Sequence, residues 1–164
     1  MRRIALVTVV ALLALSGLLV SATAFGEGAA SSSRAVLKVA FNKKLKKTIV
    51  VDGSGRTLYM FTYDHPGSPQ CEAQGPDCPQ VWPALTSTGK PLARKGINAR
   101  LITIVKGAGG KPQVSYNHHP LYHFAGGHGT GAGDKKPGDV NGQAFGYAWF
   151  VVSPQGTPIR KSGK

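Results

Sequence analysis

The hydrophobic positions of the chain form one long block followed by many short runs. Residues 4–20 are almost all apolar. Beyond residue 34 the apolar positions come in short runs that are rich in β-branched and aromatic side chains, and no stretch of helical length repeats with the period of an α-helix. This pattern predicts a mainly β chain. We expect a single compact antiparallel β domain at residues 35–156, with roughly seven short strands.

Turn residues separate the expected strands and set the predicted hairpins. The runs that read as strands are 35–41, 48–51, 57–63, 101–105, 113–116, 120–124 and 145–152. Asp-Gly-Ser-Gly at 52–55 joins the second run to the third, and Asn117-His118 lies between the fifth and the sixth. Both junctions predict hairpins. Residues 79–82 allow one helical turn before Pro83 ends it.

The first 24 residues have the three-part pattern of a secretory signal peptide. Two arginines precede the apolar block, and Ala22-Thr23-Ala24 places small residues at a cleavage site. An uncleaved membrane anchor is the alternative. The sequence has no cysteine near this junction that could carry a lipid. We therefore expect a secreted, extracytoplasmic protein with a flexible lead-in at 25–34 and a basic tail at 157–164.

The two expected hairpins resemble each other in sequence. Leu-Tyr-Met-Phe at 58–61 corresponds to Leu-Tyr-His-Phe at 121–124. An aspartate, a Pro-Gly pair and a tryptophan follow each of them: the motif residues are Tyr59, Phe61, Asp64 and Trp82, and then Tyr122, Phe124, Asp134 and Trp149. We read this as an internal duplication, with repeats at about 48–85 and 101–153.

The repeated residues have a structural interpretation. In a strand, residues two apart share a face, so the Tyr and Phe of each copy point the same way and can bury a large aromatic area. Each aspartate would accept backbone N–H bonds in the turn after its strand. Each tryptophan could cover the aromatic pair of one half. An aromatic platform for a ligand is the alternative that remains open.

These motifs resemble a family of secreted or lipoprotein repeats of unknown function. Residues 59–64, Y-M-F-T-Y-D, fit its Y-x-[FWY]-x-x-D motif, and the similarity extends over about 48–156. The resemblance implies an exported protein and no particular activity. Residues 72–77, between the cysteines, look longer than in the family. In the second copy Gly127 stands at the position of the motif aspartate, so G-H-G-T-G-A-G at 127–133 reads as an insertion.

The charge of the chain favours anionic partners. Its formal net charge is +13, and removing Arg2 and Arg3 lowers this to +11. Such a field attracts polyanions, which outside the cytoplasm are wall polymers and lipid head groups. Another exported protein is a further possible partner, and nucleic acid is not expected. The basic cluster of Lys43, Lys44, Lys46 and Lys47 is either a solvated turn or a contact for an anionic surface.

Cys71 and Cys78 are the two cysteines of the chain. An even pair in an exported protein predicts a disulfide, and six intervening residues fit neither a C-x-x-C redox motif nor a zinc knuckle.

Four histidines are candidate metal ligands: His65, His119, His123 and His128. Copper or another divalent transition metal is the ion that such a cluster would hold. On a straight strand His119 and His123 would lie about 13 Å apart, at about 3.3 Å per residue. A shared site would therefore need the loop to bring His128 back to His123, or His65 to approach.

The sequence contains no strong catalytic motif. G-x-S-x-G and H-E-x-x-H do not occur in it, and we assign no catalytic residue. The glycine loop followed by Lys135 and Lys136 could bind an anion through backbone N–H groups. The pattern favours a non-enzymatic binding or interaction module of the cell envelope. The alternative is a metal-binding or redox-linked envelope protein that uses the histidines.

Overall fold

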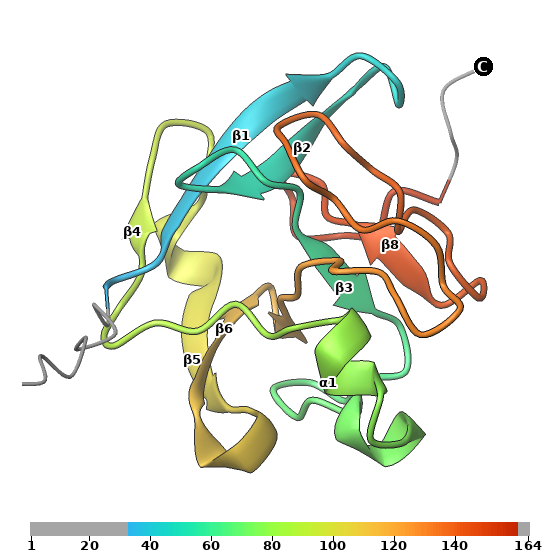
Figure 1. The fold of residues 1–164 in the computed structure, drawn as a ribbon. Coiled ribbons are helices and arrows are strands. Elements are labelled where there is room, and N and C mark those ends of the chain that lie inside the picture. The colour runs from blue at the N-terminus through green and yellow to red at the C-terminus, as the bar shows by residue number, and fades with distance from the viewer. Residues whose placement is uncertain (1–32, 161–164) are drawn as a thin grey trace, which may run out of the picture. The chain divides into compact units, whose positions relative to one another are not determined.

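Eight short strands form three small β-sheets in the computed structural model, which describes residues 33–160 (Figure 1). The predicted signal peptide and most of the predicted lead-in lie outside the described residues. The first sheet has the order β2-β1-β4, from strands β1 (Val36–Asn42), β2 (Lys47–Asp52) and β4 (Leu92–Ala93). β1 is antiparallel to β2 and parallel to the short β4.

The other two sheets contain the hairpin motifs. β3 (Tyr59–Phe61) pairs antiparallel with β8 (Trp149–Val151). β5 (Ile102–Lys106), β6 (Pro112–Tyr116) and β7 (His119–Pro120) form an antiparallel sheet in that order. Single backbone bridges link the sheets, for example Val50 N–H to the Val152 carbonyl at 2.8 Å. The predicted mainly β, largely antiparallel architecture is confirmed.

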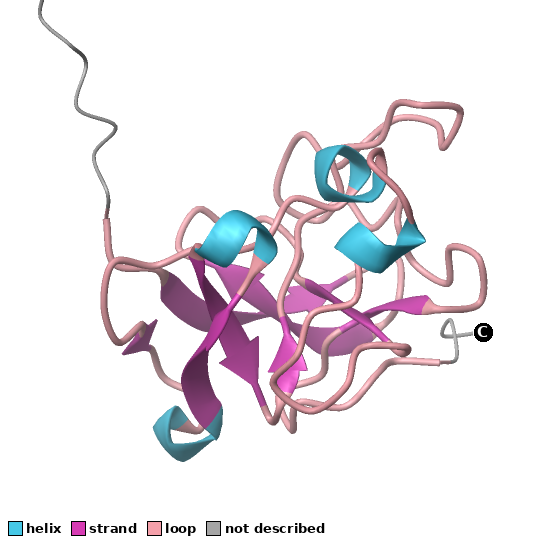
Figure 2. Ribbon diagram, turned by 90° about the horizontal axis from the view of Figure 1, so that it is seen from below, coloured by secondary structure: helices cyan, strands magenta, loops and turns pink. Residues whose placement is uncertain are grey.

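Within residues 33–160, helical structure is limited to single turns. They are α1 (Cys78–Val81) and the 3-10 turns η1 (Glu72–Gln74), η2 (Ala99–Leu101) and η3 (Ala108–Gly110). These turns lie at the periphery of the strands (Figure 2). α1 occupies the place of the helical turn predicted at 79–82. Within residues 33–160 no helix has the length and apolar character needed to cross a membrane.

The second predicted hairpin is present, and the first one is different. Asn117 and His118 both have positive φ, 50° and 67°, as a tight type I′ connection requires, and β6 returns as β7. At the first hairpin, β2 pairs with β1 across the basic turn, and only Val51 and Thr57 bridge over the Asp-Gly turn. β3 then pairs with segments other than β2. A strand that is buried on both faces needs a backbone partner on each of its edges.

The two sides of β3 face two different parts of the core. Tyr59 and Phe61 pack in a cluster with both tryptophans, whereas Leu58 and Met60 pack with aliphatic residues of β1, β2 and β6. This is the two-residue period of a strand, with both of its faces buried.

The folded domain extends slightly beyond its predicted end. We placed a basic tail at 157–164, but Ile159 is buried and its N–H bonds the Val151 carbonyl at 2.9 Å. The Ser153 N–H likewise bonds the Thr157 carbonyl at 2.9 Å, so that Val152 and Pro158 lie opposite each other in an antiparallel bridge. The pairing with β8 therefore continues through Ile159, because β8 would otherwise leave backbone groups unpaired at this edge.

Candidate functional site

The two motif tyrosines lie side by side on neighbouring segments. Tyr59 and Tyr122 exchange two backbone hydrogen bonds, both 2.9 Å long. Each hydroxyl then reaches the aspartate that follows the other tyrosine: Tyr59 donates to Asp134 Oδ2 at 2.6 Å, and Tyr122 donates to Asp64 Oδ1 at 3.2 Å. Each motif tyrosine is therefore hydrogen-bonded to the aspartate of the other motif. This arrangement is what a two-fold duplication would give, and the duplication itself stays a prediction.

Both aspartates also stabilise the turns that follow their strands. Asp64 Oδ1 accepts the Gln70 N–H at 2.6 Å, and Asp134 Oδ1 accepts the Asn141 N–H at 2.8 Å. Burial raises the pKa of Asp64 to about 7 and also raises the pKa of Asp134. Burial is likewise the main cause of the raised pKa of Tyr59 and of Tyr122. These groups are part of the packed interior rather than of an open reaction site.

The two tryptophans stack directly on each other. Trp82 and Trp149 have ring centroids 4.0 Å apart and an interplanar angle of 3°. We expected each to cover the aromatic pair of one half. Instead, Trp82 contacts Tyr59 and Phe124, and Trp149 contacts Tyr122 and Phe61. Each tryptophan thus covers the tyrosine of its own half and the phenylalanine of the other, because the two halves interlock.

The histidines do not form a common site. His123 is largely buried, and its Nε2 lies 3.6 Å from Asp52 Oδ2. Burial is the main cause that lowers the pKa of His123, and the positive charge of Arg56 is the second. His128 Nδ1 lies 3.5 Å from Asp77 Oδ1, so the glycine loop contacts the disulfide loop and not His123.

The two remaining candidates occupy other elements. His119 is on β7, where burial and then His118 lower its pKa, and His65 is in the turn closed by Ser68. In the described part of the chain, no three His, Cys, Asp or Glu residues are arranged to hold a metal ion.

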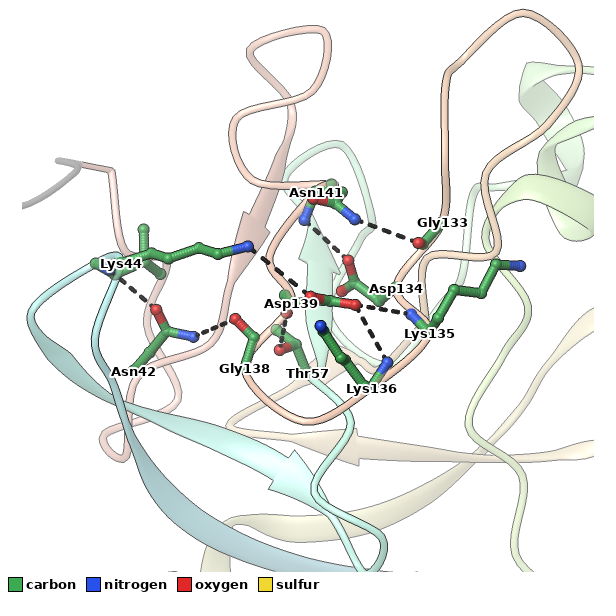
Figure 3. A network of polar contacts seen from close by, with 12 residues as sticks. Asn42, Lys44, Thr57, Gly133, Asp134, Lys135, Lys136, Gly138, Asp139 and Asn141 are labelled. Atoms are coloured by element: carbon green, nitrogen blue, oxygen red, sulfur yellow. Dashed lines mark hydrogen bonds and ion pairs between the residues drawn. The ribbon is translucent and has the colours of Figure 1, made fainter.

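The predicted anion site at Lys135 and Lys136 is filled by a carboxylate of the chain itself. The backbone N–H groups of both lysines donate to Asp139 Oδ2, at 3.1 and 3.2 Å (Figure 3). The ammonium group of Lys44 lies 3.8 Å from Asp139 Oδ1. Together these contacts lower the pKa of Asp139, the hydrogen bond from Lys135 being the first cause. The backbone N–H groups of this turn are thus used to hold it in place.

The same turn forms one wall of a basic groove. The Asn42 side-chain amide bonds the Gly138 carbonyl at 3.1 Å, and the Thr57 hydroxyl bonds the Asp139 carbonyl at 2.6 Å. These bonds hold residues 136–139 against the β1–β2 hairpin (Figure 3). The groove between them has a volume of about 660 Å³, and the lining residues that matter below are Lys38, Phe41, Lys43, Lys44, Lys136 and Asp139.

Lys38 and Phe41 were not predicted as part of this site. Phe41 is 65% exposed although it lies on a strand next to buried residues. A large apolar residue two positions before a basic cluster is the signal that could have identified it. Lys46 and Lys47, in contrast, belong to the predicted cluster but do not line the groove.

A second cavity, the aromatic pocket, lies over the tryptophan stack. It has a volume of about 320 Å³, and its lining includes both tryptophans together with Tyr63, Gln74, Asp77, His128, Thr130 and Phe145. The predicted disulfide between Cys71 and Cys78 is present, and Cys78 also lines this pocket. His128, Trp82 and Trp149 were among the predicted residues. Sequence reasoning missed Tyr63, Gln74, Asp77, Thr130 and Phe145, because they come from four separate loops.

The family resemblance predicted from the sequence is confirmed for the second half of the domain. Residues 103–153 match the family described as a secreted repeat of unknown function. The segment 48–85, which we read as the first copy, lies outside this match. No curated protein and no solved structure shows a significant similarity to the chain. The fold and the match therefore define a mainly β domain whose residues 103–153 are similar to a secreted repeat of unknown function.

Proposed function

We propose that this protein is an exported, non-enzymatic binding module that attaches to anionic polymer of the cell envelope through the basic groove. One observation carries the proposal. Lys43 and Lys44 belong to the basic cluster at residues 43–47, and Lys136 belongs to the basic pair at residues 135–136. All three line the same groove. Two clusters that are distant in sequence thus add their charges at one place, which is how a binding surface for a polyanion is built.

The groove offers chemistry beyond net charge. Within the described residues, the ammonium groups of Lys43 and Lys136 form no hydrogen bond and no ion pair. Lys136 helps to lower the pKa of Asp139, so this carboxylate balances part of its charge, whereas the charge of Lys43 is available for a ligand. Lys38 donates to the Gly53 carbonyl and Lys44 is opposite Asp139, which fixes both beside the groove. The exposed ring of Phe41 adds apolar surface. A polymer with phosphate groups joined by short carbon segments would contact both kinds of surface.

A metal-binding or redox-linked role, the alternative that the sequence left open, has less support. His123 and His128 each face a different aspartate, Asp52 and Asp77, rather than each other.

The proposal is tested by equilibrium binding to a poly(glycerol phosphate) chain at increasing sodium chloride concentration. We expect binding at low ionic strength that weakens steadily as salt screens the lysines, and no binding to uncharged dextran. Vesicles of anionic and of neutral lipid distinguish a lipid surface from a wall polymer as the source of the phosphate groups. Binding to the polymer that does not change with salt, or no binding at low salt, would contradict the proposal.

A further inference from the structure

The aromatic pocket lies where the stretch between the two cysteines meets the glycine loop, the two segments that the family resemblance led us to read as longer than usual. Gln74 and Asp77 come from the stretch between the cysteines, whereas His128 and Thr130 come from the glycine loop. The contact between Asp77 and His128, 3.5 Å long, joins the two segments at the pocket. Both segments therefore build the same cavity, although they are distant in the sequence.

The interior of the pocket is aromatic, and the ring faces of its tryptophans are already used. Trp149 lies between Phe61 at 4.3 Å and Trp82 at 4.0 Å, and the other side of Trp82 packs against Phe124 at 4.5 Å. The stack thus turns ring edges toward the cavity. Because ring edges carry partial positive charge, they suit oxygen atoms of a ligand better than a cation.

Two further aromatic side chains provide accessible surface. Tyr63 is 64% exposed and Phe145 is 36% exposed, and both line the pocket. Around them stand a carboxylate, an imidazole, an amide and a hydroxyl, from Asp77, His128, Gln74 and Thr130. An aromatic wall with hydrogen-bonding groups at its border complements a ring that has apolar C–H faces and hydroxyl groups along its rim.

From this chemistry we propose that the aromatic pocket binds a neutral sugar ring of a glycan. The volume of about 320 Å³ is at the lower end of small-molecule sites, which fits one or two rings. One C–H face of the sugar packs on Tyr63, and its hydroxyls exchange hydrogen bonds with Asp77, Gln74 and His128. This site shares no lining residue with the basic groove, so the inference goes beyond the proposed function and does not depend on it.

Intrinsic fluorescence gives a direct test, because the chain has two tryptophans and both line the pocket. The domain is titrated with maltotriose and with the β-1,4-linked trimer of N-acetylglucosamine. We expect a saturable fluorescence change with at least one of these neutral probes, unaffected by added salt. Salt-independence separates this result from the outcome of the polyanion experiment.

Two variants of similar type locate the binding. Tyr63→Ala removes an exposed ring from the pocket and should weaken sugar binding at least about tenfold, a difference of about 1.4 kcal/mol. Phe41→Ala removes an equally exposed ring from the basic groove and should leave the sugar affinity unchanged. Gln74→Ala, at an exposed position, should also weaken binding without affecting the fold.

Three results would overturn the inference. The first is that neither trimer changes the fluorescence up to about 10 mM, well above a millimolar dissociation constant. The second is that the Tyr63→Ala variant and the parent bind with equal affinity. The third is that only a quaternary ammonium compound such as choline gives saturation.

Discussion

Asp64 illustrates how a motif residue can be structural and still sensitive to its surroundings. Its Oδ1 accepts bonds from Gln70 and Tyr122, but its buried Oδ2 has no hydrogen-bond partner among the described residues. Burial therefore outweighs the two hydrogen bonds and raises the pKa of the carboxyl to about 7. The role of Asp64 in its turn could be predicted from its position after a strand. Its contact with Tyr122 could not, because that depends on the packing of two distant hairpins.

This raised pKa predicts a pH dependence of stability. The native state holds a proton on Asp64 that the unfolded chain releases near pH 4, so ionisation of this group lowers the free energy of unfolding as pH rises from about 4 to about 7. The slope contributed by one group is at most about 1.4 kcal/mol per pH unit. Asp64→Asn removes this contribution, since the amide does not titrate.

Urea unfolding of the parent and of Asp64→Asn at several pH values measures the effect. We expect the parent to lose stability relative to the variant across this window. A difference that is constant with pH would show that Asp64 titrates normally in the folded protein.

At the scale of elements, the glycine loop is held by close backbone contacts at its base. Gly126 and Ala132 form a bridge, and Thr130 bonds the Gly127 carbonyl through its hydroxyl and its N–H. The reading of this loop as an insertion stays a prediction, and the sequence did not indicate its orientation. Glycine-rich segments have few side chains to specify where they pack, so only the contact of His128 with Asp77 shows that the loop turns toward the disulfide.

The base of the loop provides a matched pair of substitutions. A Cβ at Gly133 would overlap the Ala125 carbonyl, whereas a Cβ at Gly129 meets open space and only the cost of its positive φ. Gly129→Ala should therefore lower the unfolding free energy by about 1 kcal/mol, and Gly133→Ala by about 1–3 kcal/mol more. Thermal or urea denaturation checks this order. Equal losses for the two variants would mean that the base of the loop is not packed as described.

At the scale of the whole molecule, the sequence indicated the ingredients better than their arrangement. The mainly β class, the disulfide and the hairpin at Asn117 follow from local patterns of turn residues, β-branched residues and cysteines. The pairing of β3 with β8 and the joining of two basic stretches in one groove are long-range contacts. No periodicity within a short segment encodes such contacts, because they depend on how the three sheets pack together.

The most direct test of the groove is to compare two double variants that change the net charge equally. Lys43→Gln with Lys136→Gln removes two groove charges, and Lys95→Gln with Lys111→Gln removes two exposed charges that do not line it. In titrations with poly(glycerol phosphate) at low salt, we predict that the groove variant binds about tenfold more weakly than the parent, or about 1.4 kcal/mol. The control variant should bind nearly as well as the parent. Equal weakening of both variants would contradict the account, because binding would then depend on overall charge and not on this groove.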